Sequence, residues 1–397
     1  MTTAIETHEP AGFDGRSAGP QRATPLELFF DLVYVFAFTQ VTHLMAEGAD
    51  LTSVLGGVAV LGVLWWSWAS HAWLANQRVA DRGVVRIGIL IAIAMVLVLS
   101  ISIPEVYPGP GESHFGALLF ATSFVVLSLA YTGVNILVAG GDVLLRRQAI
   151  LTMGVTIVPV SAALITGAVL GGPAQIALWL AAVAIEGITV YLTSRGGRWQ
   201  LPSAGHYAER HGLVVILALG ESIISIGFGA AHAALSPLVV VGALLAVTLS
   251  LSMWWHYFGR LSAAAERHIN ELEGARRTGV ATVGTYLHFG IVAGVLLASL
   301  GISGAIEHIE EASNIGIFNA TALAGGLALF FASTAAYVSV SSRRLAWESA
   351  IAAALTLALI PVVAITPPLA AMGIVVLLTL GLSTYRHFRT LPTEQIL

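Results

Sequence analysis

Long apolar segments alternate with short polar connections along nearly the whole chain. Stretches of about 20 apolar residues, the length at which a helix crosses the hydrocarbon core of a bilayer, recur between Leu26 and Tyr385. Counted by that rule of about 20 residues per span, they predict about twelve membrane-spanning helices at 26–46, 52–75, 83–103, 114–139, 146–170, 173–193, 211–232, 235–258, 278–303, 315–339, 344–365 and 367–387. The connections are too short to fold as separate soluble domains, so we expect an all-α integral membrane protein.

The composition supports this fold class and excludes several kinds of site. Of the 397 residues, 57% are hydrophobic and only 10% are charged, with a mean hydropathy of +0.85, whereas soluble domains are about 45–50% apolar and about 25% charged. The net charge of −4, spread over short loops, offers no basic face for nucleic acid. The chain has no cysteine, which excludes disulfides and thiolate metal sites. No cofactor is indicated.

The arginines predict how the helices are oriented. All 18 basic residues are Arg, and each falls on the same side of the twelve-helix arrangement, in a tail, in a loop or at the end of a span. Because cytoplasmic loops carry the excess of Arg and Lys, we expect both termini to be cytoplasmic. By this assignment no Arg lies deep within a span. Residues 1–24 lack the basic start and apolar core of a signal peptide, so they are expected to form a disordered cytoplasmic tail.

Landmarks repeat between the two halves of the chain. The second expected helix ends in "LWWSWASHAWLANQ" and the eighth in "SMWWHYFGR", each with a Trp pair; the fifth and eleventh each begin with two arginines and contain Pro159 and Pro361. Repeats of six helices have the same orientation and are known among secondary transporters. We therefore expect two six-helix pseudo-repeats at 25–194 and 211–388, a cytoplasmic linker at 195–210 and a cytoplasmic tail at 389–397.

Six tryptophans gather near the cytoplasmic ends of two predicted helices. An aromatic belt at the membrane–water interface explains such a gathering without a ligand site. We assign to this belt Trp65, Trp66, Trp68, Trp73, Trp254 and Trp255.

The first predicted helix carries polar residues on more than one side. Thr24 and Glu27, with Pro25 between them, form a capping box, which explains Glu27 without a function. Asp31 lies one turn deeper and Gln40 farther along. We therefore expect this helix to be packed inside the bundle, with Asp31 and Gln40 as candidate site residues.

The stretch "GLVVILALGESIISIGFG" places Glu221 near the middle of a span, with Ser222 and Ser225 beside it. An ionised side chain at a helix centre costs on the order of 3 kcal/mol, and no Arg is assigned to the membrane. A neutral carboxyl, hydroxyl donors, pairing with His288 at a similar depth, or a water-filled cavity would each stabilise it. Glu221 is therefore a candidate proton-binding group. The alternative is a permanently protonated carboxyl that ties helices together. Glu186 is a further candidate, nearer the cytoplasmic side.

Three motifs carry a resemblance to a known family. The segments "ELFFDLVYVFAFTQ" (27–40), "WWSWASHAWLANQ" (65–77) and "HYAERHGLVVILALGES" (206–222) resemble the low temperature requirement A (LtrA) family of bacterial membrane proteins. The resemblance implies a polytopic inner-membrane protein. It brings no established catalytic or transport residues, because the family is named for a growth phenotype rather than a chemistry.

Three classes of function are compatible with these features. The leading hypothesis is a transporter or permeation protein, in one form proton-coupled, with the bilayer and an unidentified small solute or ion as its partners. A non-transporting sensor or assembly protein is the alternative. A membrane-embedded enzyme is less expected, because the nearest approach to a catalytic cluster is His206, Glu209 and His211, which we expect to cap and solvate the start of the seventh helix. The oligomeric state is left open.

Overall fold

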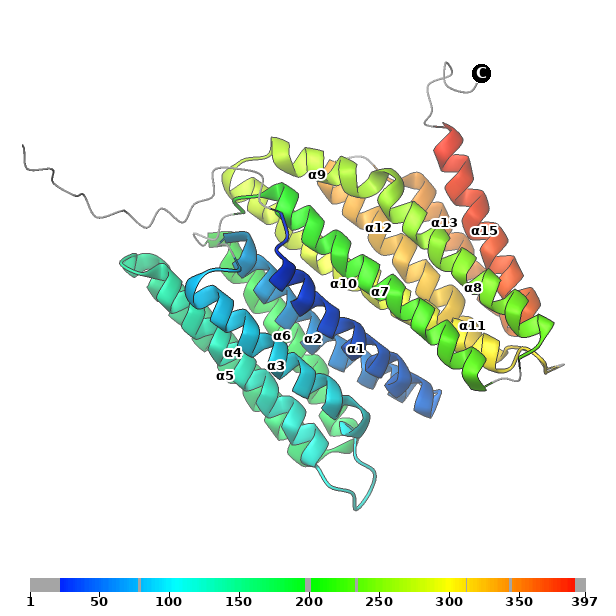
Figure 1. The fold of residues 1–397 in the computed structure, drawn as a ribbon, viewed down its shortest axis with the longest axis horizontal. Helices are drawn as coiled ribbons and strands as arrows, with labels where there is room; N and C mark the ends of the chain where they lie inside the picture. The colour runs from blue at the N-terminus through cyan, green and yellow to red at the C-terminus, as the bar shows by residue number, and fades with distance from the viewer. Residues whose placement is uncertain are drawn as a thin grey trace, which may run out of the picture.

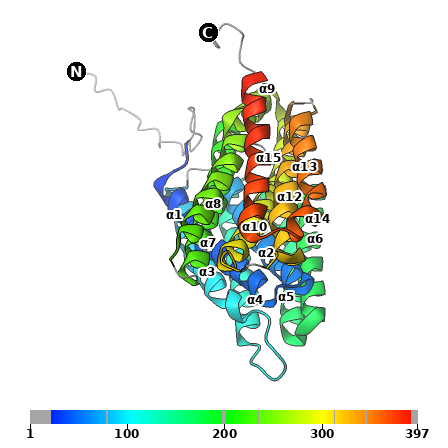
Figure 2. The same ribbon diagram turned by 90° about the vertical axis from the view of Figure 1, so that its right-hand side faces the viewer.

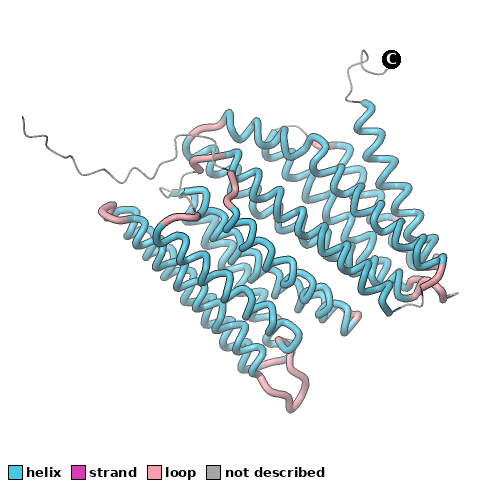
Figure 3. Tube along the Cα trace, in the orientation of Figure 1, coloured by secondary structure: helices cyan, strands magenta, loops and turns pink. Residues whose placement is uncertain are grey.

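The protein is a bundle of long helices, described here from a computed structural model. The description covers residues 22–77, 80–196, 201–232, 235–311, 313–342 and 345–389, and within these ranges there is no strand (Figure 3). The helices are α1 (Pro25–Gly48), α2 (Leu51–Gln77), α3 (Gly83–Ser102), α4 (Phe115–Ala139), α5 (Val143–Leu170), α6 (Gly172–Gly196), α7 (Ala204–His232), α8 (Pro237–His256), α9 (Ser262–Glu271), α10 (Gly274–Glu307), α11 (Gly316–Ala320), α12 (Gly326–Ser342), α13 (Trp347–Ala358), α14 (Ile360–Ala364) and α15 (Pro368–Arg389). Single turns of 3₁₀ and π helix, η1 (Ile103–Glu105), η2 (Tyr257–Leu261) and η3 (Thr321–Gly325), connect some of them.

Eleven helices in the described ranges are long and apolar enough to cross a membrane. The twelfth expected segment coincides with α15, whose described apolar part, Pro368–Thr384, is shorter than the others, so a count of twelve stays a prediction. Large apolar side chains such as Leu32, Leu244 and Leu377 lie exposed on the outside of the bundle. This pattern is the one that a lipid environment requires, and the protein is a multi-pass membrane protein.

The helices form two groups that meet along α1, α2, α7 and α10 (Figures 1 and 2). In the first group α1 packs against α2 and α3, α3 against α4, α4 against α5, and α6 against both α5 and α2. In the second group α7 packs against α8 and α10, α10 against α12, α12 against α13, and α15 against both α13 and α8. The groups touch where α1 contacts α7 and α10, and where α10 also contacts α2 and α6. Helix α1 begins and α15 ends at the same end of the bundle.

Two helix boundaries differ from those expected. Helix α7 begins at Ala204 rather than at 211, because the polar side chains of its first turns are buried against other helices instead of being solvated. Helix α8 continues through the π turn η2 directly into α9, which lies within the stretch expected to be a loop. Pro361 follows a break between α13 and α14, whereas Pro159 lies inside the unbroken α5.

Side-chain caps fix the starts of the first two helices. The expected capping box is confirmed, because the Thr24 hydroxyl accepts from the Glu27 backbone N–H and the Glu27 carboxylate accepts from the Thr24 N–H. Asp50 precedes α2 and accepts hydrogen bonds from the backbone and hydroxyl of Ser53, each 2.8 Å long. The backbone hydrogen bond from Ser53 holds the pKa of Asp50 below its usual value.

Helices α10 and α12 pack with their backbones in contact. A Cβ built on Gly294 would lie 2.5 Å from the Phe330 backbone nitrogen, and one on Gly326 would lie 2.4 Å from the Ala298 nitrogen. Both distances are shorter than carbon and nitrogen can approach without bonding. Small residues serve this purpose in membrane bundles, where close van der Waals packing drives helix association.

The assignment of all six tryptophans to an interfacial belt was wrong. Trp65, Trp66 and Trp68 are buried inside the bundle, with relative exposures between 1% and 7%. Trp254 and Trp255 are 47% and 37% exposed, as a belt requires. The error arose because the part of α2 that carries these tryptophans is enclosed by other helices, so their side chains face protein.

Candidate functional site

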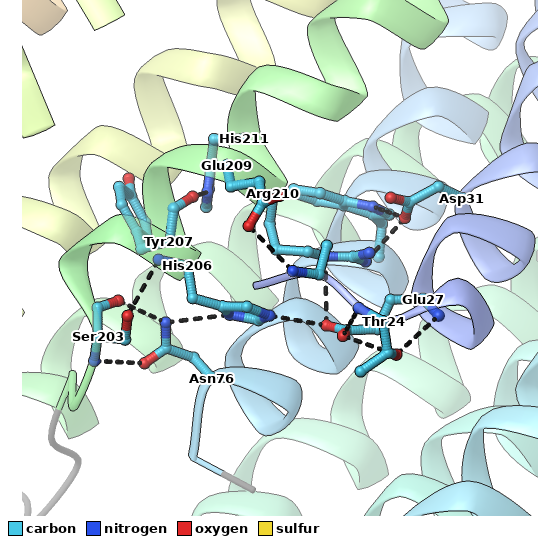
Figure 4. A network of polar contacts seen from close by, with 12 residues as sticks. Thr24, Glu27, Asp31, Asn76, Ser203, His206, Tyr207, Glu209, Arg210 and His211 are labelled. Atoms are coloured by element: carbon cyan, nitrogen blue, oxygen red, sulfur yellow. Dashed lines mark hydrogen bonds and ion pairs between the residues drawn. The ribbon is translucent and has the colours of Figure 1, made fainter. Parts of the chain in front are cut away.

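A buried ion pair joins the two groups of helices between α1 and α7 (Figure 4). Arg210 donates from Nη2 to Oδ1 of Asp31 at 2.7 Å, and both side chains are almost completely buried. The indole Nε1 of Trp68, from α2, donates to the same carboxylate oxygen at 2.9 Å. The Arg210 guanidinium carbon lies 5.9 Å from the centre of the Trp68 ring, within the range of a cation–π interaction. Three helices therefore converge on one carboxylate.

A second contact lies one turn away on the same two helices. His206 Nε2 is 3.0 Å from Oε1 of Glu27, and Arg210 Nε is 3.8 Å from the same oxygen. Asn76 donates to the Ser203 carbonyl and accepts from the Ser203 N–H, which fixes the orientation of its amide. Its Nδ2 then faces His206 Nδ1 at 3.3 Å. An N–H group hydrogen-bonds to that nitrogen when Nδ1 accepts, which is the tautomer in which Nε2 carries the proton and donates to Glu27.

These contacts correct three expectations from the sequence. An Arg does lie inside a candidate span, less than two turns from the start of α7, and it is 1% exposed; the carboxylate of Asp31 therefore has a basic partner. His206 and His211 are buried rather than solvated. Glu27 closes the capping box but also binds His206. A sequence signal existed: Glu27 and Asp31 are four residues apart, as are His206 and Arg210, so each pair lies on one helix face.

Glu221 lies deeper along α7 in a cluster of hydroxyl groups. It is completely buried, accepts a hydrogen bond from Ser225, and lies beside the hydroxyls of Thr42 on α1 and Ser299 on α10. Ser299 in turn bonds Ser222. The carboxyl oxygen Oε2 has no hydrogen-bond partner in the described part of the chain. The structure thus joins three predicted residues, Glu221, Ser222 and Ser225, at the meeting of α1, α7 and α10.

His288, considered as a partner of Glu221, bonds elsewhere. Its Nε2 lies 2.8 Å from the Tyr257 hydroxyl and its Nδ1 lies 2.7 Å from the Gly284 carbonyl oxygen. Its ring also packs edge-on against His211, with 4.7 Å between ring centres. Gln40 is half-buried on α1 and makes no hydrogen bond to another described residue. Neither side chain joins the Glu221 cluster.

Glu186 occupies a cavity of about 120 Å³ near the ends of α2 and α6 and the start of α10. Its side chain is only 9% exposed and has no hydrogen bond or ion pair to any residue in the described ranges. Around it the cavity is lined by aromatic and hydroxyl side chains, including Trp66, His71, Trp73, Tyr131, Thr156, Thr282 and Tyr286. Four helices of the first group, α2, α4, α5 and α6, and α10 of the second group enclose it.

A second cavity of about 450 Å³ adjoins the first at Ser194 and Thr282, which line both. It lies among α6, α9, α10 and α12, and its lining includes His268 and Arg276. The inner cavity has no Arg among the described residues that line it. The two cavities together form an inner chamber with an acidic group and an outer chamber with basic groups.

Comparison with known proteins identifies the family. Residues 22–384 match the family described as bacterial low temperature requirement A protein (LtrA). The chain belongs to the LtrA family. It is also similar to an uncharacterized protein of Rhizobium meliloti (strain 1021), with 30% identity over 341 residues that make up 81% of this chain and 78% of the relative. No solved structure matches it.

The three motifs of the LtrA resemblance meet in the structure. The first supplies Glu27 and Asp31 on α1 and the third His206 and Arg210 on α7 (Figure 4). The second supplies Trp68 and Asn76 on α2. What unites the motifs is a buried polar contact among three helices. Among the described residues, no group of three or more His, Cys, Asp or Glu side chains is arranged to hold a metal ion.

Proposed function

We propose that this LtrA protein is a secondary transporter of a small solute in the bacterial inner membrane, with both termini cytoplasmic. The observation that carries the proposal is the cavity around Glu186, which is enclosed by helices of both groups and contains an acidic group that no described residue hydrogen-bonds or pairs with. Solute sites of secondary transporters lie at the interface between structural repeats. An even number of passes, supported by α1 beginning and α15 ending at the same end of the bundle, agrees with termini on one side.

The packing of the helices supports two six-helix pseudo-repeats. With α7, α8, α10, α12, α13 and α15 taken as equivalents of α1 to α6, the packed pairs of the first group, among them α1–α3, α2–α6 and α4–α5, recur in the second as α7–α10, α8–α15 and α12–α13. Helices α3 and α10 both begin at a glycine with positive φ, Gly83 at 54° and Gly274 at 52°. Such a backbone conformation is accessible mainly to glycine.

The contacts between α1 and α7 also support a repeat. Glu27 and His206 are 179 residues apart, and so are Asp31 and Arg210; Thr42 and Glu221 have the same separation, 221 − 42 = 179. For any two parallel helices in contact, the residues that face each other differ in number by a constant amount. Here the spacing equals the distance between the helix starts, 204 − 25 = 179, so side chains at the same height in the two helices meet. Equivalent helices packed about a twofold axis along the membrane normal have this geometry.

In this proposal the two halves rock against each other around the α1–α7 contact, and the chamber around Glu186 opens to alternate sides. The Asp31–Arg210 pair holds the halves in register rather than exchanging protons. Glu221 is the group that we assign to proton exchange in a proton-coupled form of the mechanism, because its carboxyl is surrounded by hydroxyl groups rather than by a cation.

Cysteine accessibility tests alternating access before the solute is known. Because the chain contains no cysteine, Ser70→Cys can be introduced in the inner cavity and Ser252→Cys, buried between α8 and α15, can serve as a sealed control. We expect a membrane-impermeant maleimide to label position 70 from either side of sealed vesicles and to spare position 252. Labelling of position 70 from one side only would contradict alternating access and favour a non-transporting sensor.

A further inference from the structure

Among the described residues, the carboxyl of Glu186 has no counter-charge to compensate its burial. Placing a carboxylate in a low-dielectric interior is unfavourable unless a charge or hydrogen bonds compensate it. The other acids of the bundle interior are compensated: Asp31 and Glu27 by Arg210 and His206, and Glu221 by hydroxyl groups. No described residue bonds Glu186, although its carboxyl faces a chamber large enough to admit a ligand.

Aromatic rings surround the same carboxyl. Tyr131 and Tyr286 lie close enough to Glu186 to interact with it electrostatically. Trp66 packs edge-on against Tyr286 with 4.9 Å between ring centres, and His71 packs against Tyr131 at 5.4 Å. The Tyr286 hydroxyl is held in place because it donates to the Gly187 carbonyl at 2.6 Å. A carboxylate beside several ring faces is the arrangement that binds organic ammonium ions, because rings attract the cation while they remain compatible with its methyl groups.

The size of the chamber limits the ligand. A cavity of about 150 Å³ holds one benzene molecule, with its six carbon atoms, so the roughly 120 Å³ of this chamber accommodates about five non-hydrogen atoms. Tetramethylammonium has this size, and the hydroxyl end of the slightly larger choline would extend toward the adjoining second cavity at Ser194 and Thr282. A bulkier amine would have to displace side chains from the wall.

We propose that the inner chamber binds a compact alkylammonium ion, with its charge against Glu186 and its alkyl groups against the rings of Trp66, Tyr131 and Tyr286. This inference names the solute class of the proposed transporter and rests on the proposed function only in the claim that the ligand crosses the membrane. The binding site itself stands on the carboxyl, the rings and the cavity.

Equilibrium binding to the purified full chain tests the site. Choline and tetramethylammonium are titrated at constant ionic strength while tryptophan fluorescence is followed, since Trp66 and Trp73 line the chamber. The matched probe is 3,3-dimethylbutan-1-ol, a neutral molecule with the shape of choline, and acetate is the anionic control. We expect both ammonium ions to bind at least about tenfold more tightly than the neutral probe. Equal binding of the neutral probe, or no saturable binding of either ammonium ion up to roughly 10 mM, would overturn the proposal.

Two variants test whether the negative charge of Glu186 is what binds the ammonium ion. Glu186→Gln keeps the shape of the side chain and should weaken choline binding at least about tenfold without changing binding of the neutral probe. Glu47→Gln removes an exposed carboxylate at the end of α1 and should leave choline binding unchanged. Choline binding unaffected by Glu186→Gln would sink the assignment. If that variant does not fold, the charge selectivity of the unaltered protein still decides.

Uptake of labelled choline into proteoliposomes separates this inference from the proposed function. Saturable binding without uptake would retain the ammonium site and refute transport. Uptake of choline that persists in Glu186→Gln would retain transport and refute the site.

Discussion

Removal of Arg210 should destabilise the protein more than removal of Asp31. Arg210→Met leaves Asp31 and Glu27 buried near each other with no cation between them. Asp31→Asn leaves Arg210 with Glu27, whose carboxylate is 3.8 Å from the guanidinium Nε, and the Asn amide oxygen can still accept from Trp68. Loss of the arginine should therefore lower the free energy of unfolding more than loss of the aspartate.

The distances give the size of the difference. At an effective dielectric constant of about 20, the Asp31–Arg210 attraction at 2.7 Å is about 6 kcal/mol and the Glu27–Arg210 attraction at 3.8 Å is about 4 kcal/mol before desolvation. Arg210→Met loses both, so we expect a loss of about 3–5 kcal/mol in the free energy of unfolding, typical of a buried charge left uncompensated. Asp31→Asn loses a hydrogen bond to a charged group, about 1.5–3 kcal/mol. In the double variant the costs should not add, with a coupling of about 1 kcal/mol or more.

Reversible unfolding of the purified protein in mixed micelles of rising SDS fraction, followed by tryptophan fluorescence, measures these energies. Arg86→Met is the matched control, since Arg86 and Asp81 form an exposed ion pair at 3.6 Å and such pairs contribute at most about 1 kcal/mol. The reasoning is refuted if Arg210→Met costs no more than Arg86→Met, or if the energies of Arg210→Met and Asp31→Asn simply add.

The other stability predictions use matched pairs in the same assay. Gly326→Ala should lower the free energy of unfolding by about 1–3 kcal/mol through overpacking against α10. Its control, Gly373→Ala, has open space around the added Cβ and should be neutral or stabilising. Equal effects would contradict the close helix packing. Trp68→Phe should cost about 1.5–3 kcal/mol by removing the donor to Asp31, against less than about 0.5 kcal/mol for the exposed Trp254→Phe, and a reversed order would place Trp68 outside the contact. Thr24→Ala should cost about 1 kcal/mol by breaking the capping box, and no loss would show that the box adds nothing to stability.

Features that depend on one segment at a time could be predicted from the sequence. The apolar segments indicated an all-helical membrane protein because each satisfies its own backbone hydrogen bonds within the segment. The capping box of Thr24 and Glu27 is local for the same reason. The burial of Glu221 follows from the apolar residues on both sides of it, and its hydroxyl neighbour Ser225 is one turn away on the same helix.

Features that depend on contacts between segments distant in the sequence could not be predicted from it. Charged residues in "HYAERH" were interpreted as solvated because an isolated helix gains nothing by burying them. Only the approach of α1, carrying Glu27 and Asp31, makes burial of His206 and Arg210 favourable. The chamber around Glu186 is still harder to foresee, because its walls come from five helices and no single stretch of sequence contains the pattern.

The proposed repeat explains why the residues that meet between α1 and α7 differ in kind. Identical halves related by a twofold axis would bring each residue of α1 against its own copy, so that Asp31 would face a second aspartate at close range. Two buried like charges repel, whereas Asp31 opposite Arg210 attracts. Different residues at equivalent positions of α1 and α7 therefore replace a repulsive contact with an attractive one. Because both halves belong to one chain, α1 always meets α7 rather than a second copy of itself. The contact favours a single partner and register, as the proposed pivot between two halves requires. It leaves the proposed ligand chamber to one side, where α10 packs against four helices of the first group.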